Sequence, residues 1–281
     1  MTNQLFINNE FIESQSKETM DVINPATGEA FDTITLATEE EVNDAIEKSQ
    51  QAQLEWERVP QPTRAEHVKL LIPLLEKNRD EIAQLYVKEQ GKTLAQAYGE
   101  IDKSISFIDY MTSLSMSDKG SVLQNSIANE TIQIINKPIG VTAGIVPWNA
   151  PILVLMRKVI PAIVTGCSVV IKPSEETTLL TLRLAELFRA STIPAGLIQI
   201  VPGTGETVGT QLASHKDIQL ISLTGSMRAG KSVYENAAQT VKKVNLELGG
   251  NAPVIVTSNA DLDKAVDYIV TARINLSLIH I

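Results

Sequence analysis

The sequence contains little cysteine and histidine, and it lacks any long apolar run. Cys167 is the only cysteine among 281 residues, so it can form neither an intrachain disulfide nor a thiol-rich metal site. The three histidines are scattered, and no two of them have the spacing of a zinc site. No apolar stretch approaches the roughly 20 residues that cross a bilayer. We therefore expect no metal and no membrane span.

Positive charge is also scarce, and the formal net charge is −9. Such a chain repels phosphate backbones, and no basic stripe with interleaved aromatic residues offsets that repulsion, so nucleic acid is excluded as a partner. The first residues, Met1 to Gln4, are not a basic segment followed by an apolar one, so no secretory signal is visible and the predicted location is cytoplasmic. The length allows one large domain or two modest ones.

The first half of the chain is predicted to be mainly helical. Residues 5–13 have the pattern of a short surface hairpin turning at Asn8 and Asn9. Thr38 and Glu41 form a capping-box pattern, and the apolar spacing that follows predicts a helix from about residue 39 to residue 57.

Two further helices and a polar arm follow. Pro62 stands at the start of a second helix, which Pro73 is expected to kink, and an apolar stripe from 97 to 108 predicts a third. Residues 118–129 are polar, and residues 131–135 have the composition of a strand, so we expect an arm between two blocks.

From Gly140 onward, short apolar runs alternate with helical stretches, as βαβ units require. A parallel sheet covered by helices is the natural interpretation, and dinucleotide binding is the commonest use of such a sheet at this size. The predicted fold class is therefore α/β, with a Rossmann-like parallel sheet, flanking helices, a helical N-terminal subregion and a short β arm. The predicted strands are residues 141–146, 169–171, 197–201, 220–223, 244–246 and 254–256.

Lys172 and Glu175 directly follow one predicted strand, where open α/β sheets bind their ligands. A carboxylate there can accept hydrogen bonds from a ribose diol, while the lysine supplies a cation and donors. NAD fits better than NADP, because a 2′-phosphate would meet the charge of Glu175, although Lys172 offsets part of it. The alternative is a helix N-terminus at which acidic residues are favoured by the dipole.

Two glycine-containing turns follow other predicted strands. Residues 203–209 have the spacing GxGxxxG, one residue longer than the dinucleotide fingerprint. Thr224, Gly225 and Ser226, with Gly230 beyond them, place small residues where backbone N–H groups and a hydroxyl can meet phosphate oxygens. The alternative for the second turn is a helix cap at Ser226.

Asn149 and Glu247 are candidates for catalysis. Asn149 ends the turn that begins with Pro147 and Trp148, and an amide aimed into a pocket can donate to a developing oxyanion. Its alternative role is to cap the next helix. Glu247 ends an apolar strand, and partial burial there would suit it to act as a general base. Its alternative is a solvated acid at a strand end.

Four motifs in this order resemble the aldehyde dehydrogenase superfamily: PWN at 147–149, KPSE at 172–175, LTGS at 223–226 and ELGG at 247–250. The resemblance extends from about Leu5 to Arg273. It implies oxidation of an aldehyde to a carboxylic acid with NAD or NADP, through a cysteine thiohemiacetal and a thioester, with Asn149 at the oxyanion and Glu247 activating water. The implied cofactor-binding residues are Pro147, Trp148, Lys172, Ser174, Glu175, Gly205, Gly209, Thr224, Gly225, Ser226, Gly230 and Leu248.

Among the subfamilies, residues 140–174 and the GETVG stretch are most similar to lactaldehyde and glycolaldehyde dehydrogenases, although Ala150 replaces the phenylalanine common after PWN. The implied partners are a small aldehyde and, for the full-length protein, further copies of itself in a homo-oligomer. The implied organisation is an N-terminal helical part of the cofactor-binding domain at 1–120, a β arm resembling part of the oligomerisation region at 121–138, a Rossmann-like NAD-binding domain at 139–250, and the start of a catalytic domain at 251–281.

The resemblance stops near the end of the sequence. Family members continue into an Asn-x-Gly-Gln-x-Cys signature, which would place the nucleophilic cysteine at or next to Ile281, and residues 275–281 do not match it. Cys167 is no substitute, because it lies between an apolar helix and a buried strand, where an inert thiol is expected. We therefore expect a truncated, inactive chain whose residues 276–281 are non-native. The alternative is a non-catalytic dinucleotide-binding remnant.

Overall fold

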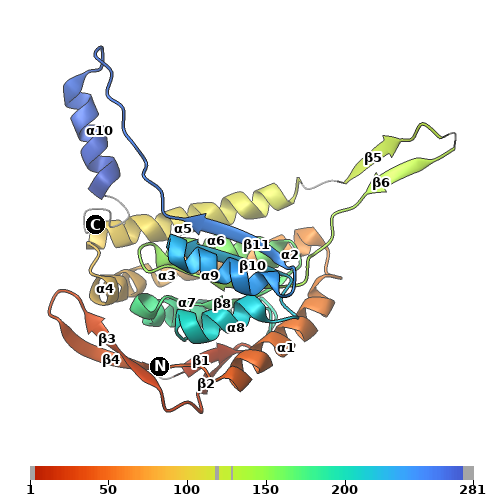
Figure 1. Ribbon diagram of the computed structural model, residues 1–281, viewed down its shortest axis with the longest axis horizontal. Helices are drawn as coiled ribbons and strands as arrows, with labels where there is room; N and C mark the ends of the chain where they lie inside the picture. Colours follow the sequence, from red (N-terminus) through yellow and green to blue (C-terminus); the bar gives the residue numbers. More distant parts are fainter. Residues whose placement is uncertain (1–3, 118–119, 128, 275–281) are drawn as a thin grey trace.

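The computed structural model describes residues 4–117, 120–127 and 129–274. Its body is a seven-stranded sheet with helices on both faces, and a β-hairpin and a helix extend from this body as two arms (Figure 1). The α/β fold with a parallel sheet and flanking helices, predicted from the alternation of apolar strands and helices, is confirmed.

The strand order in the sheet is β11-β10-β7-β8-β9-β1-β2. The five strands from β11 to β9 run parallel, whereas β1 pairs antiparallel with β9 and with β2. The carboxyl ends of the five parallel strands therefore meet along one edge of the sheet. The strands are β1 (Gln4–Ile7), β2 (Glu10–Glu13), β7 (Val141–Ile145), β8 (Ser168–Lys172), β9 (Ile198–Ile200), β10 (Leu220–Gly225) and β11 (Lys243–Leu248).

Alternating side chains of the central strands face two separate cores, as the pleat of a strand requires. In β8, Val169 and Ile171 belong to one core and Val170 to the other. The core with Ile171 is covered by α6 (Pro151–Val164) and α7 (Thr178–Ala190). Four earlier helices pack against these two: α2 (Gln61–Lys69), α3 (Leu71–Lys77), α4 (Arg79–Gln90) and α5 (Leu94–Ser115). The opposite core is covered by α1 (Glu39–Trp56), α8 (Thr210–Ser214) and α9 (Met227–Ala238).

The N-terminal hairpin is present, and its predicted surface location is right for β2, an edge strand, but wrong for β1. Asn8 and Asn9 form the turn with φ of 55° and 64°. Leu5, Phe6 and Ile7 are nevertheless at most 2% exposed, because β1 joins the main sheet beside β9. Adding this strand covers the hydrogen-bonding groups of β9 and buries an apolar face, which an isolated hairpin cannot do.

The first predicted helix is confirmed with its capping box: Glu41 N–H donates to the Thr38 hydroxyl, and the Glu41 carboxylate accepts from Thr38 N–H. The second predicted helix is wrong in its continuity, because three helices, α2, α3 and α4, occupy its place. Breaks occur at Leu70 and Asn78 rather than at Pro73. Pro73 lies in the first turn of α3, where a missing N–H costs no helical hydrogen bond.

Two small hairpins stand apart from the main sheet. One consists of β3 (Thr19–Asn24) and β4 (Glu29–Thr35), and the other of β5 (Ser121–Gln124) and β6 (Thr131–Ile134). The strand predicted at 131–135 is confirmed as β6, while β5 lies in the segment predicted to be a polar arm. The β5–β6 hairpin extends away from the body (Figure 1), and every residue of its two strands is exposed.

The strand predicted at 254–256 is wrong. These residues have no regular structure, and Ile255 is 86% exposed. A strand needs a hydrogen-bonding neighbour, and none of the described residues supplies one here. The chain runs extended from β11 to α10 (Leu262–Ile274), which stands away from the sheet (Figure 1). The predicted non-native tail and the position expected for the cysteine lie outside the described residues. Within the described part of the chain, no helix is long and apolar enough to cross a membrane.

Candidate functional site

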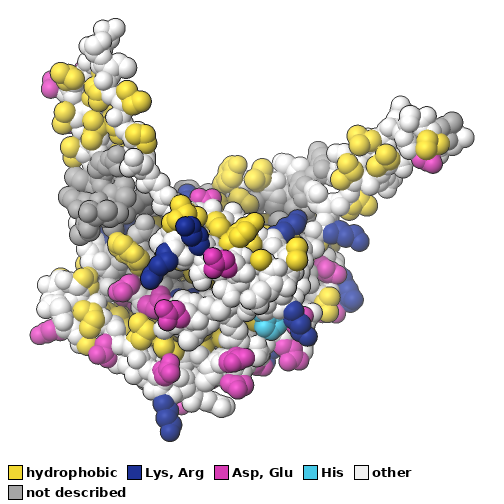
Figure 2. Space-filling view, viewed as in Figure 1, with side chains coloured by type: hydrophobic (Ala, Val, Ile, Leu, Met, Phe, Trp, Pro, Cys, Tyr) yellow, Lys and Arg dark blue, Asp and Glu magenta, His cyan; other side chains and the backbone are white. Residues whose placement is uncertain are grey.

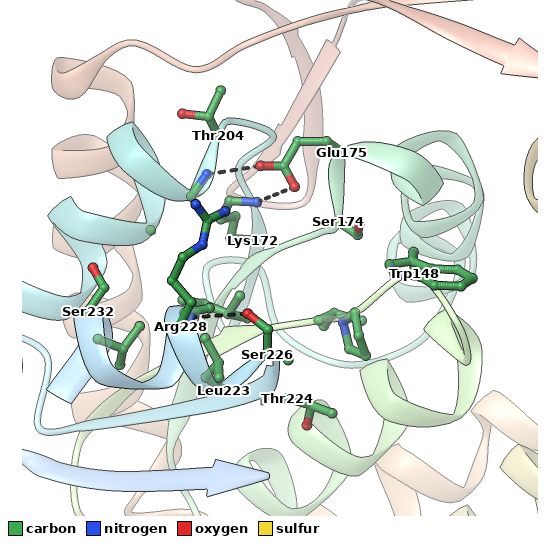
Figure 3. A pocket seen from close by; sticks show the side chains of 18 of the residues that line it. Trp148, Lys172, Ser174, Glu175, Thr204, Leu223, Thr224, Ser226, Arg228 and Ser232 are labelled. Atoms are coloured by element: carbon green, nitrogen blue, oxygen red, sulfur yellow. Dashed lines mark hydrogen bonds and ion pairs between the residues drawn. The ribbon is translucent and has the colours of Figure 1, made fainter. Parts of the chain in front are cut away.

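The carboxyl ends of β7, β8, β10 and β11 open into one pocket of about 1180 Å³ (Figure 3). Drug-sized ligands occupy clefts of roughly 300–1,000 Å³, so this pocket can hold a larger molecule. Its lining includes every predicted site residue except Gly230 and the expected cysteine. The sequence motifs are thus brought together by the parallel sheet, which ends its strands along one edge.

The pair Lys172 and Glu175 forms one wall of the pocket. The Lys172 side chain is only 2% exposed, and its Nζ lies 3.2 Å from a carboxylate oxygen of Glu175 and donates to the Pro173 carbonyl at 2.9 Å. Burial lowers the pKa of Lys172, and the charge of Glu175 opposes that shift. The second carboxylate oxygen of Glu175 accepts the N–H of Gly205 at 2.9 Å, as the dashed lines in Figure 3 show.

Glu175 therefore joins the turn after β8 to the turn after β9. Its side chain is 30% exposed, so the carboxylate still faces the pocket. The alternative of a helix N-terminus is confirmed alongside this, because Ser174 caps the 3₁₀ helix η1 (Glu175–Thr177) by accepting Glu176 N–H at 3.3 Å.

The glycine-rich turn is a π-helical turn, η2 (Gly205–Gly209), capped by Thr204. A Cβ at Gly209 would lie 3.8 Å from Lys172 Cδ, which is an ordinary contact. A Cβ at Gly203 would instead lie 2.2 Å from Val208 Cγ2. Steric crowding therefore requires glycine at Gly203, and the other glycines leave room at the pocket wall.

In the second glycine-containing turn, Ser226 caps α9 by accepting Ala229 N–H at 3.2 Å, so the helix-cap alternative is confirmed. The hydroxyl hydrogen of Ser226 remains able to donate toward the pocket. Gly230 is buried and does not line the pocket. A Cβ there would lie 2.6 Å from Leu248 Cδ2, so the missing side chain of Gly230 leaves room for Leu248, which lines the pocket.

Asn149 lines the pocket from the turn before α6. Its neighbour in the chain, Trp148, is labelled in Figure 3 and is 42% exposed. The prediction that Asn149 could cap α6 is wrong, because Ala150 is the N-cap residue and no side-chain cap bond is present among the described residues. The backbone carbonyl of Asn149 accepts from Lys92 Nζ at 3.0 Å and lies 3.4 Å from the Tyr86 hydroxyl. The backbone of this turn is therefore fixed at a residue that lines the pocket.

Glu247 also lines the pocket, but its predicted partial burial is wrong. It lies in β11, the edge strand of the sheet, and its side chain is exposed. An edge strand has a neighbour on one side only, and no described residue covers Glu247 from the other side. Its alternative as a solvated acid at a strand end describes its state in this chain.

Two cationic residues near these groups, Lys158 and Arg228, were not predicted from the sequence. Lys158 of α6 donates to Ser222 Oγ at 3.0 Å and to Thr224 Oγ1 at 3.1 Å. Burial lowers the pKa of Lys158 to about 8, and the negative charge of Glu247 opposes that shift. The available signal was the pair Arg157 and Lys158 within a helix, 151–164, that is otherwise apolar. Arg228, in the first turn of α9, reaches into the pocket toward the side of Glu175 (Figure 3).

These groups fit the parts of a dinucleotide. The partly exposed carboxylate of Glu175 can accept further hydrogen bonds from a diol, and Arg228 with the N-terminus of α9 can meet a diphosphate. A Cβ at Gly225 would have no contact shorter than 3.6 Å, so there is space beside this glycine in which a ligand can lie against the backbone. Among the described residues, no three His, Cys, Asp or Glu side chains gather into a group that could hold a metal ion.

Comparison with known proteins agrees with this geometry. The lactaldehyde dehydrogenase of Escherichia coli is 36% identical over 96% of this chain and 56% of its own length. A solved 3,6-anhydro-L-galactose dehydrogenase in complex with NAP superimposes with a TM-score of 0.95 at 36% identity, over 99% of this chain and 58% of that one. A betaine aldehyde dehydrogenase variant from Staphylococcus aureus, in complex with NAD+, gives 0.91 at 35% identity, over 95% and 55%.

The chain thus spans about half the length of the relatives it matches. The family model described as "Aldehyde dehydrogenase family" matches residues 11–277, which is nearly the whole sequence. The matched region contains all four motifs around the pocket and the five parallel strands that bring them together. The chain belongs to the aldehyde dehydrogenase family.

Proposed function

We propose that the whole protein oxidises an aldehyde to a carboxylic acid with NAD as the electron acceptor, and that this chain supplies the cofactor-binding half. One observation carries the proposal: a partly exposed carboxylate, a helix N-terminus, an asparagine and a glutamate, each from a different strand end, line one pocket. When bound, NAD supplies the acceptor for the hydride that leaves the substrate carbon. The chain's own residues bind, orient and exchange protons around it.

Glu175 and Lys172 are proposed to hold the adenosine ribose, with the carboxylate accepting from the diol. Gly225, Ser226 and Arg228 are proposed to meet the pyrophosphate at the N-terminus of α9. NAD is preferred over NADP because Glu175 is the more exposed member of its ion pair with Lys172. A 2′-phosphate would therefore meet the negative charge of Glu175 first. Arg228 opposes part of this repulsion, which makes the selectivity a matter of degree.

Asn149 is proposed to donate its side-chain amide to the oxyanion, and such a donor is worth roughly 10²–10³ in rate. Glu247 is proposed to activate the water that releases the acid. Both roles come from the family resemblance, supported by the location of both side chains in the pocket wall. The nucleophilic thiol is proposed to belong to the part of the whole protein that this chain does not span, since Cys167, the only cysteine of the sequence, is buried just before β8.

The proposed substrate is a short aldehyde, with lactaldehyde or glycolaldehyde as first candidates. Support comes from the similarity of residues 140–174 and the GETVG stretch to dehydrogenases of these aldehydes, and from the 36% identity with the E. coli lactaldehyde dehydrogenase.

We also propose that residues 1–120 are the N-terminal helical part of the cofactor-binding domain, that 139–250 are its Rossmann-like part, that 121–138 are an arm, and that 251–281 are the start of a catalytic domain. The arm presents apolar side chains to solvent, including Val122 at 70% and Ile135 at 69% exposed. In Figure 2, hydrophobic side chains gather along this hairpin. Such a surface fits a contact with another copy of the protein, so we propose a homo-oligomer. The cytoplasmic location stays a prediction.

The test begins with the 281-residue chain, titrated calorimetrically with NAD and with NADP. Saturable binding with NAD preferred supports the cofactor assignment, and no binding to either rejects it. The gene product that includes the family's cysteine is then supplied with lactaldehyde, glycolaldehyde and other short aldehydes. Aldehyde-dependent formation of NADH is expected. Cofactor binding without any turnover would instead favour the non-catalytic dinucleotide-binding alternative.

A further inference from the structure

Two helices that begin beside the pocket are capped by buried glutamates from distant parts of the chain. Helix α6 follows Asn149, and helix α7 follows the Ser174–Thr177 segment that contains Glu175. Within the described chain, neither helix receives a hydrogen bond from the side chain of its own N-cap residue. Their first N–H groups are nevertheless satisfied, as the start of a buried helix requires.

Glu100 of α5 caps α6. One of its carboxylate oxygens accepts the N–H of Ile152 at 3.0 Å and the N–H of Leu153 at 3.2 Å. The other accepts the Tyr86 hydroxyl at 2.7 Å and Lys92 Nζ at 2.8 Å. The side chain is 5% exposed, so this carboxylate is removed from water and depends on these four donors.

Lys92 extends the same network to the pocket. Its side chain is 7% exposed, and besides Glu100 its Nζ donates to the Tyr86 hydroxyl at 2.7 Å and to the carbonyl of Asn149 at 3.0 Å. The network therefore fixes both sides of one turn: the carbonyl of Asn149 and the first amides of the helix that follows. The Asn149 side chain has little freedom left other than its own rotation.

Glu89 of α4 caps α7 in the same way. Its two oxygens accept the N–H of Leu179 at 2.7 Å and of Leu180 at 2.8 Å, and its side chain is 3% exposed. No cationic side chain among the described residues forms an ion pair with it. The Thr178 hydroxyl, at the start of the same helix, donates to the Ser174 carbonyl at 2.8 Å. Glu89 therefore holds the helix that anchors the segment containing Glu175.

We infer that these two buried glutamates are positioning residues with separate duties: Glu100, through Lys92 and Tyr86, sets Asn149 for the aldehyde, and Glu89 sets the Glu175 segment for the cofactor. This inference rests on the proposed function, because it assumes the roles given there to Asn149 and Glu175. A small displacement of a reacting group costs up to roughly 10² in rate, so loss of Glu100 should lower kcat. Loss of Glu89 should instead weaken the binding of NAD.

The two glutamates are matched controls for each other, since both are buried and both bind two helix-terminal amides. E100Q in the full-length enzyme should lower kcat by roughly ten- to hundred-fold and leave the Kd for NAD unchanged. E89Q should raise the Kd for NAD by about ten-fold and leave kcat at saturating NAD unchanged. Urea unfolding of both variants shows how much stability each has lost. If both lose kcat and NAD affinity together, in proportion to lost stability, the separate duties are rejected.

Lys92 supplies a second line of test that tolerates a poorly folding E100Q. K92M should lower kcat, and K92R, which keeps a cationic donor, should restore part of it. In an N149A background, K92M should cause little further loss, because its effect passes through Asn149. Losses that multiply would show that Lys92 acts elsewhere and would overturn the inference. The Kd arm, measured on the 281-residue chain, tests Glu89 without any turnover.

Failure of the proposed function gives a different pattern. If the full-length wild type forms no NADH with any aldehyde, or if N149A keeps full kcat, the function or the role of Asn149 is wrong. If N149A is inactive while E100Q and K92M behave as wild type, the function stands and the positioning inference fails.

Discussion

Glu175 and Glu247, two of the acidic residues that line the pocket, come from different parts of the sheet, and their surroundings differ. Glu175 follows β8, an interior strand, and is held by Lys172 and by the N–H of Gly205. Glu247 lies in β11, at the edge, where its side chain is exposed. Beyond β11 the described chain runs on with apolar side chains in solvent, among them Ile255 and Leu262. A strand end is thus organised by the elements on both sides of it, and an edge strand has them on one side only.

The largest expected effect is on the free energy of unfolding when the interior of the sheet is disrupted. Ile171 in β8 is fully buried, so I171A should lower the free energy of unfolding by about 2–5 kcal/mol. Ile255, the matched residue beyond β11, is 86% exposed. I255A should therefore change the free energy of unfolding by no more than about 0.5 kcal/mol. Urea unfolding measures both. Equal losses would mean that the segment after β11 is as well packed as the sheet.

The next effect concerns Glu89, behind the Glu175 segment. Burial raises the pKa of Glu89 from 4.5 to about 8, although the backbone N–H groups of Leu180 and Leu179 act to lower it. The folded chain therefore holds this proton more tightly than the unfolded one. The resulting stability is fully present below pH 4.5 and is lost as the pH rises through about 8.

Across that range, wild type should lose up to about 4 kcal/mol of unfolding free energy relative to E89Q, whose side chain does not titrate. Urea unfolding of both proteins at a series of pH values measures the difference. Parallel pH profiles of the two proteins would show that Glu89 keeps an ordinary pKa in the fold, stabilised by its two amides.

A smaller effect is expected on cofactor binding, where Glu175 and Glu247 can be compared directly. E175Q should raise the Kd for NAD by about ten-fold, because a charged acceptor for the ribose hydroxyls is lost, and it should narrow the preference over NADP. E247Q should leave the Kd for NAD unchanged, since Glu247 is proposed to act on water rather than on the cofactor. Isothermal titration of the 281-residue chain measures all four constants. Equal weakening by both variants would contradict the separation of ribose and water sites.

The smallest effect is expected at the edge strand. A Cβ at Gly230 would meet the flexible end of Leu248, which can move, so G230A should cost less than about 1 kcal/mol. Gly166, on the interior side, has φ of +89° and its Cβ would lie 2.7 Å from Pro138 Cγ. G166A should therefore cost more, roughly 1–3 kcal/mol. Thermal unfolding ranks the two variants, and a reversed order would show that β11 is packed more rigidly than β8.

The sequence allowed the α/β fold to be predicted, with most of the strands and the residues that line the pocket. Those predictions depend on local patterns, such as the apolar run of β8 followed by Lys172 and Glu175, and on the rule that parallel strands end at one edge. The same patterns could not separate a helix cap from a ligand contact at Ser226, because a hydroxyl serves both.

Only the tertiary structure decided which side chains are buried and which distant groups hold the site. β1 joins the main sheet, 254–256 is no strand and Glu247 is exposed, because burial depends on neighbours that no local pattern names. Likewise, Glu89 and Glu100 look like surface acids of amphipathic helices in sequence. Their carboxylates reach helix starts 52 to 91 residues away, and such contacts arise only when the helices pack together.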